Sequence, residues 1–135
     1  MGKNWAENFS NNLTICLEAG DWTITKDGEG VKELYYEDKS LCALPSLYYY
    51  ADVFKSGIVL NAQKANGCTA FYAFKNGVET PTLQIEGQTL NMEKDGDLII
   101  FKELTEEGIQ EKAILDSHTF EQLTQELDGQ IGFSF

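Results

Sequence analysis

The sequence contains no arginine, so its positive charge comes from ten lysines alone. Bidentate guanidinium clamps, with which many proteins hold phosphates and carboxylates, are therefore excluded. Against these lysines stand 22 Asp and Glu residues in 135, which gives a formal net charge of −12. A field of this sign repels nucleic-acid phosphates and anionic lipids. We therefore expect neither direct nucleic-acid binding nor attachment to a membrane surface.

Cysteine is scarce as well, and its number is odd: Cys16, Cys42 and Cys68. An odd count favours free thiols in a reducing compartment. The first eight residues lack the apolar stretch of a secretory signal, and the longest apolar region, residues 41–54, is interrupted and too short to cross a bilayer. We therefore expect a cytoplasmic protein.

Patterns that would indicate catalysis or cofactor binding are missing too. Asp116-Ser117-His118 contains the three residue types of a hydrolase triad, but consecutive side chains project in different directions. No Cys and His pair has the short spacing of zinc ligands, and Asp95-Gly96-Asp97 lacks the other ligands of a calcium loop. We expect no catalytic residue, no metal and no cofactor. An enzyme that uses two scattered carboxylates remains a third alternative, because sequence offers no way to choose two among 22.

What the chain does have is a series of turn signals about every ten residues: Asn66-Gly67, Asn76-Gly77, Glu86-Gly87, Asp95-Gly96 and Glu107-Gly108. Asn-Gly and Asp-Gly pairs tolerate the positive φ angles of tight hairpin turns. The short segments between them have strand-like alternation, which predicts an antiparallel meander. Residues 98–101 are apolar on both faces and are expected to form its most central strand.

Helices are predicted on both sides of the meander. Near the N-terminus, apolar residues at helical spacing precede a terminating glycine: Trp5, Phe9, Leu13, Cys16, Leu17 and Gly20. Near the C-terminus, a capping-box pair, an apolar stripe and another terminating glycine follow one another: Thr119, Gln122, Phe120, Leu123, Leu127 and Gly129. Residues 131–135 then alternate like a short last strand.

These patterns predict one α+β domain over residues 1–135. Its core is an antiparallel β-meander of six to eight strands, with an N-terminal helix and a helix plus a short strand at the C-terminus. The sequence leaves open whether the meander closes, wholly or partly, into a barrel.

The tripeptide Gly20-Asp21-Trp22, at the head of the first predicted strand, resembles the Gly-x-Trp motif of lipocalin-like barrels. The order of elements, with a helix after the meander, is similar as well. The resemblance implies a barrel that binds a small apolar ligand. Together with the expected reducing compartment, this gives the alternative function, an intracellular lipocalin-like barrel that binds a small molecule. Lipocalins usually pack an arginine across that tryptophan, and this chain has none.

A run of tyrosines, Tyr48-Tyr49-Tyr50, is the most conspicuous aromatic feature. In a strand, Tyr48 and Tyr50 would face one side and Tyr49 the other. Such residues pack well in sheets, and they are also enriched in the energetic centres of protein interfaces. Both interpretations stay open at the level of sequence.

Negative charge is concentrated in the second half of the chain. Residues 1–65 have a net charge of −3 and residues 66–135 a net charge of −9. The acids near the predicted turns are the candidate partner-binding residues: Glu93, Asp95, Asp97, Glu103, Glu106, Glu107 and Glu111. An acidic surface accelerates the encounter with a basic partner and can occupy its phosphate-binding cleft.

The leading hypothesis from sequence is therefore a non-catalytic acidic protein that neutralises a basic protein. Its partner would be a nuclease toxin or a nucleic-acid-binding defence protein, as for toxin immunity proteins and phage anti-defence inhibitors.

Overall fold

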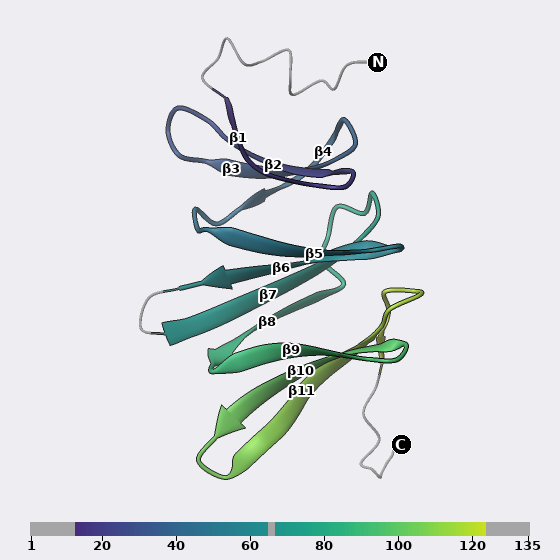
Figure 1. The fold of residues 1–135 in the computed structure, drawn as a ribbon. Helices are drawn as coiled ribbons and strands as arrows, with labels where there is room; N and C mark the ends of the chain where they lie inside the picture. The colour runs from purple at the N-terminus through teal and green to yellow at the C-terminus, as the bar shows by residue number, and fades with distance from the viewer. Residues whose placement is uncertain (1–12, 65–66, 124–135) are drawn as a thin grey trace.

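The computed structural model describes residues 13–64 and 67–123, and every regular element in these ranges is a β-strand (Figure 1). Consecutive strands form three antiparallel sheets of four strands each. Sheet A consists of β1 (Thr14–Ala19), β2 (Trp22–Lys26), β3 (Lys32–Tyr36) and β4 (Lys39–Leu44). Sheet B consists of β5 (Tyr49–Phe54), β6 (Gly57–Gln63), β7 (Cys68–Lys75) and β8 (Leu83–Gln88). Sheet C consists of β9 (Leu90–Asp95), β10 (Leu98–Thr105), β11 (Gly108–Asp116) and β12 (Gln122–Leu123).

The three sheets are stacked face to face, with sheet B in the middle (Figure 1). One apolar core lies between sheets A and B and includes Trp22, Ile24, Leu34, Leu60, Tyr72 and Phe74. A second core lies between sheets B and C and includes Val59, Phe71, Ala73, Ile99, Phe101, Leu115 and Phe120. Because successive side chains of a strand point to opposite faces, the inner strands of sheet B supply residues to both cores in alternation.

Of the five turns predicted from the sequence, three lie at connections between strands, at Asn76-Gly77, Asp95-Gly96 and Glu107-Gly108, whereas Asn66 of the Asn66-Gly67 pair lies outside the described residues. Asp95-Gly96 joins β9 to β10, with Gly96 at a φ of +60°. In the turn between β2 and β3, the Asp27 carboxylate accepts hydrogen bonds from the backbone N–H groups of Glu29 and Val31, at 2.8 and 2.9 Å. The turn predicted at Glu86-Gly87 is wrong, because both residues lie within β8. The chain turns instead at Thr89, with a φ of +48°, where it passes from sheet B to sheet C.

The predicted α+β class is wrong, because the described part of the chain contains no α-helix. Residues 14–19, the second half of the expected N-terminal helix, form β1, which pairs antiparallel with β2. At the expected C-terminal helix, Phe120 has a φ of +57° and residues 122–123 form β12, paired with β11. In both places tertiary strand pairing overrides a helical spacing of apolar residues. Residues 1–12, with the start of the first helix, and residues 124–135, with the end of the second helix and the last strand, lie outside the described ranges.

A barrel, and with it the lipocalin-like architecture, is also contradicted. Within the described residues each sheet is open and ends in two edge strands, and the apolar residues are buried between sheets rather than around a lumen. Trp22 of the Gly-x-Trp tripeptide packs into the core between sheets A and B, in an edge-on contact with Tyr36 at 4.9 Å between ring centroids. Residues 98–101 do belong to an inner strand, but to one of an end sheet; the most central strands are β6 and β7.

Hydrogen bonds between turns group the connections at two ends of the stack. At one end, Asn76 N–H donates to the carbonyl of Ser56 at 3.0 Å, and the Ser56 hydroxyl donates to the carbonyl of His118. At the same end, Ser117 N–H donates to the carbonyl of Asp97 at 2.8 Å. At the other end, Leu104 N–H donates to the carbonyl of Thr89 at 3.2 Å. The turns near Asn76 and Asp95 therefore lie at the same end of the stack.

Candidate functional site

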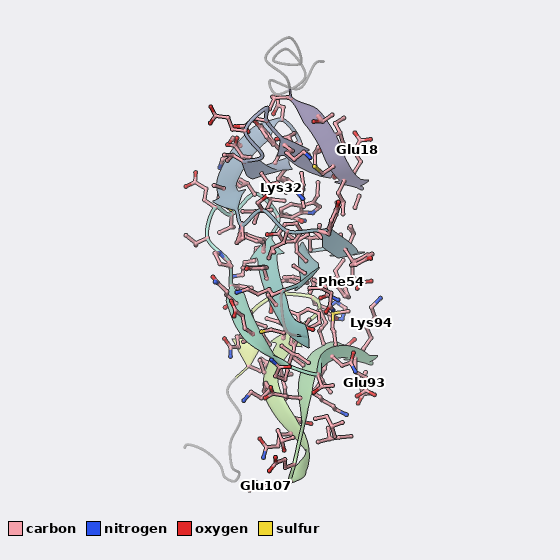
Figure 2. The ribbon with its side chains drawn as sticks, turned by 90° about the vertical axis from the view of Figure 1, so that its left-hand side faces the viewer. Glu18, Lys32, Phe54, Glu93, Lys94 and Glu107 are labelled. Atoms are coloured by element: carbon pink, nitrogen blue, oxygen red, sulfur yellow. The ribbon has the colours of Figure 1, made fainter. Side chains whose placement is uncertain are left out.

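The seven acids singled out from the sequence all lie in sheet C or in its two hairpin turns. They do not form a single cluster. One group surrounds the turn between β9 and β10, and the other surrounds the turn between β10 and β11, at the opposite end of the sheet (Figure 1). Figure 2 shows this separation, with Glu93 on β9 and Glu107 at the far tip of the next hairpin.

Two of these acids are neutralised by lysines, and a third lies in hydrogen-bond contact with a histidine. Glu93 pairs with Lys102 at 2.6 Å, Glu103 with Lys112 at 3.4 Å, and Asp97 with His118 at 2.9 Å. The hydrogen bond from Lys102 to Glu93 raises the pKa of this lysine, and the carboxylate of Glu111, which lies opposite Lys102 in the β10–β11 register, adds to the effect.

Asp95, Glu106 and Glu107 are exposed and form no ion pair with the rest of the described chain. Of the two turns, the one between β10 and β11 therefore carries two adjacent free carboxylates. These charges are available to a partner.

Two large apolar side chains flank that turn. Leu104 and Ile109 are direct cross-strand partners on β10 and β11, and they are 56% and 70% exposed. They lie on the face of sheet C opposite the core, because Ile99 and Phe101 point the other way from β10. We call this surface, which carries Glu93, Lys102, Leu104, Ile109 and Glu111, the outer face of sheet C. Neither apolar residue was singled out from the sequence, although the two stand on either side of Glu106-Glu107-Gly108.

The outer face of sheet C is hollowed. A depression of about 360 Å³ lies across β9, β10 and β11, and its lining includes Asn91, Glu93, Lys102, Leu104 and Ile109. The lining thus combines apolar side chains with the Glu93–Lys102 ion pair. Such a mixture suits a protein surface better than a small apolar molecule.

Charge is divided unevenly among the three layers. Residues 14–44 of sheet A contain seven acids and three lysines, a net charge of −4. Residues 49–88 of sheet B contain three of each and are neutral, whereas residues 90–123 of sheet C contain nine acids and three lysines, a net charge of −6. The neutral layer is the one with both faces buried, since charges are costly to bury. Sheet C is the most negative layer.

The Asp116-Ser117-His118 segment forms a turn and not a triad. The Asp116 carboxylate accepts hydrogen bonds from the backbone N–H groups of His118 and Thr119, at 2.7 and 3.1 Å, and these bonds lower the pKa of Asp116. The His118 ring lies against Asp97 instead, and this hydrogen bond raises the pKa of His118. His118 is exposed as expected, but it has a structural partner that the sequence did not indicate.

The three consecutive tyrosines have different environments. Tyr49 is half-buried between sheets A and B, where its hydroxyl donates to the carbonyl of Pro45 at 2.7 Å and burial raises the pKa of its phenol. Tyr48 and Tyr50 are exposed. Only the middle residue therefore packs into the core.

Among the residues that the structure describes there is no apolar helix long enough to span a membrane. In comparisons with known proteins, no family model, no curated protein and no solved structure matches this chain.

Proposed function

We propose that this chain is a non-catalytic binding protein that neutralises a basic protein partner, and that it docks through the outer face of sheet C. The observation that carries the proposal is the exposed pair Leu104 and Ile109 beside the unpaired carboxylates of Glu106 and Glu107. Protein interfaces typically combine an apolar centre with a polar rim. The β10–β11 hairpin offers both within one turn.

Charge complementarity supports a basic partner. Sheet C has a net charge of −6, and a field of this sign attracts a cationic protein and accelerates the encounter. Proteins that bind nucleic-acid phosphates present such surfaces, so a nuclease toxin or a nucleic-acid-binding defence protein is the partner class that fits. The chain would then act as an immunity or anti-defence inhibitor in the cytoplasm, a setting that suits its free thiols.

The proposal is tested by capture of partners with the purified full chain from a lysate of its native host, at low and at high salt. Reversing two charges at the docking surface, with Glu106→Lys and Glu107→Lys, is compared with the same reversal at Glu18 and Glu29 of sheet A. All four side chains are exposed, so neither variant disturbs the core.

We expect the wild type and the sheet A variant to recover the same basic protein, and the sheet C variant to lose roughly tenfold or more of it. Recovery must also fall as salt rises, because exposed charges are screened. Equal losses in both variants, or capture that is indifferent to ionic strength, would refute docking through sheet C.

A further inference from the structure

Most lysines of this acidic protein are paired with carboxylates, and the exceptions are informative. Nine lysines lie in the described ranges, and six of them form ion pairs with Asp or Glu. The three without such a pair are Lys26, Lys32 and Lys55. Two of these, Lys26 and Lys32, occupy directly opposite positions on β2 and β3. Like charges at opposite positions of an antiparallel pair are destabilising, so this arrangement calls for a physical reason.

Lys32 is only 7% exposed, which is unusual for a side chain with a full charge. Figure 2 shows it at the level where sheet A faces sheet B. Its ammonium donates to the carbonyl of Leu47 and lies 5.0 Å from the ring centroid of Tyr48 and 5.8 Å from that of Tyr49. These aromatic faces compensate part of the charge, but no described carboxylate lies within ion-pair distance.

A lysine ammonium has three N–H donors, and the Leu47 carbonyl accepts from one of them. Burial of a charge without a counter-charge is costly. An anion bound beside Lys32 would remove this cost and would also relieve the repulsion between Lys26 and Lys32.

A hollow lies at this position. It has a volume of about 160 Å³ and is lined by both lysines, by Tyr48 and Tyr49, and by residues of sheet A. Cys16, Leu17 and Ile24 give it an apolar side. The volume is well below the roughly 300–1,000 Å³ of sites for drug-sized ligands, so only a small molecule fits.

We propose that this hollow binds a small organic carboxylate whose body is apolar or aromatic. Lys32 and Lys26 hold the carboxylate, and the apolar side of the hollow and the Tyr49 ring receive the body. Tyr48 stands at the exposed rim of the hollow, being 85% exposed, and its ring is accessible to the ligand. This site lies between sheets A and B and does not depend on the docking surface proposed for sheet C.

The test uses benzoate as the probe, benzamide as a neutral molecule of the same shape, and inorganic phosphate as an anion without an apolar body. Binding to the full chain is followed by NMR, through saturable shifts of the Lys32 and Tyr48 side-chain signals. The variants are Lys32→Met and Lys26→Met, with Lys55→Met as the matched control, because Lys55 is also unpaired but lies in the turn between β5 and β6.

We expect benzoate to bind the wild type and the Lys55→Met variant alike, and to bind Lys32→Met about tenfold more weakly or worse, as expected for loss of a charge-assisted hydrogen bond. Benzamide should bind the wild type more weakly than benzoate does, by a factor similar to that for benzoate on Lys32→Met. If Lys32→Met does not fold, the exposed Lys26→Met variant gives the same comparison with a smaller loss.

Three results would overturn the proposal. The first is the absence of saturable benzoate shifts in the wild type. The second is a loss in Lys55→Met equal to that in Lys32→Met. The third is tighter binding of phosphate than of benzoate, which would show that the apolar side of the hollow is not used.

Discussion

The ring of Phe120 packs directly against Gly57, and it can do so only because Gly57 has no side chain. A Cβ atom at Gly57 would lie 2.5 Å from Cδ2 of Phe120 and closer still to the carbonyl oxygen of Phe74. Phe120 is fully buried in the core between sheets B and C, and its φ of +57° turns the chain so that the ring reaches this position. Gly57, at the start of β6, therefore leaves the space that the Phe120 ring fills. This contact holds the turn between β11 and β12 against sheet B.

The first prediction concerns Gly57→Ala. The added methyl group collides with a backbone oxygen and a buried ring, so the free energy of unfolding should fall by about 1–3 kcal/mol, as in other overpacked cores. Urea denaturation monitored by tryptophan fluorescence measures it. Gly96→Ala is the control, because a Cβ there meets no atom within 4 Å and only the positive φ makes it costly. A loss at Gly57 no larger than that at Gly96 would contradict the packing described.

The second prediction concerns pH. The hydrogen bond to Asp97 raises the pKa of His118 above its unfolded value, so the charged imidazole stabilises the folded chain. This contribution is fully present below about pH 6.5, the unfolded histidine value, and is lost as pH rises through the folded pKa. An NMR titration of His118 should show a lower pKa in Asp97→Asn than in the wild type. An unchanged value would show that the Asp97 contact is not made in solution.

The third prediction concerns the cysteines. Burial raises the pKa of the Cys42 thiol, and the carboxylates of Glu33 and Glu79 raise it further, whereas Cys16 is exposed. Because the thiolate is the reactive form, iodoacetamide at neutral pH should alkylate Cys42 roughly tenfold more slowly than Cys16. Mass spectrometry of digested samples measures both rates. In urea the two rates should converge; a difference that persists there would not arise from the fold.

The fourth prediction separates binding from stability at the outer face of sheet C. Leu104→Thr combined with Ile109→Thr places β-branched residues at both strand positions and removes exposed apolar surface, so stability should change by less than about 0.5 kcal/mol. Capture of the proposed basic partner should nevertheless fall. Val53→Thr, at another exposed apolar position, is the control and should capture as the wild type does. Retained capture by the double variant would remove Leu104 and Ile109 from the docking surface.

Local turn chemistry was predictable, and the layering was not. Asp95-Gly96 and Asn76-Gly77 form turns because the conformations they need are properties of a few consecutive residues. The division into three sheets depends on where the chain passes from one layer to the next, before β5 and at Thr89. No local pattern marks such a passage, because strand-turn-strand signals look the same within a sheet and between sheets.

One signal of the central layer was present and was misinterpreted. Residues 70–74 are apolar without interruption, and the structure buries all of them on the two faces of β7. Residues 98–101 have the same character over a shorter run and belong to an end sheet. The longer run was the better indicator of a strand covered on both sides.

The candidate sites were predictable only in part. Acidic residues at the turns of sheet C could be found from the sequence, but which of them are neutralised depends on cross-strand neighbours such as Lys102 and Lys112. The site around Lys32 was not foreseeable, because it needs the β2–β3 register and the approach of the segment before β5. The sequence contains Lys32, but only the fold shows that this lysine is buried without a counter-charge.

The position of sheet B between two separate cores has a consequence for how the molecule comes apart. Either end sheet can detach and leave one core intact, whereas the middle sheet cannot open without exposing apolar residues on both of its faces. Partial opening would therefore begin at the charged outer layers, and the amide hydrogens of β6 and β7 would be the last to exchange with solvent.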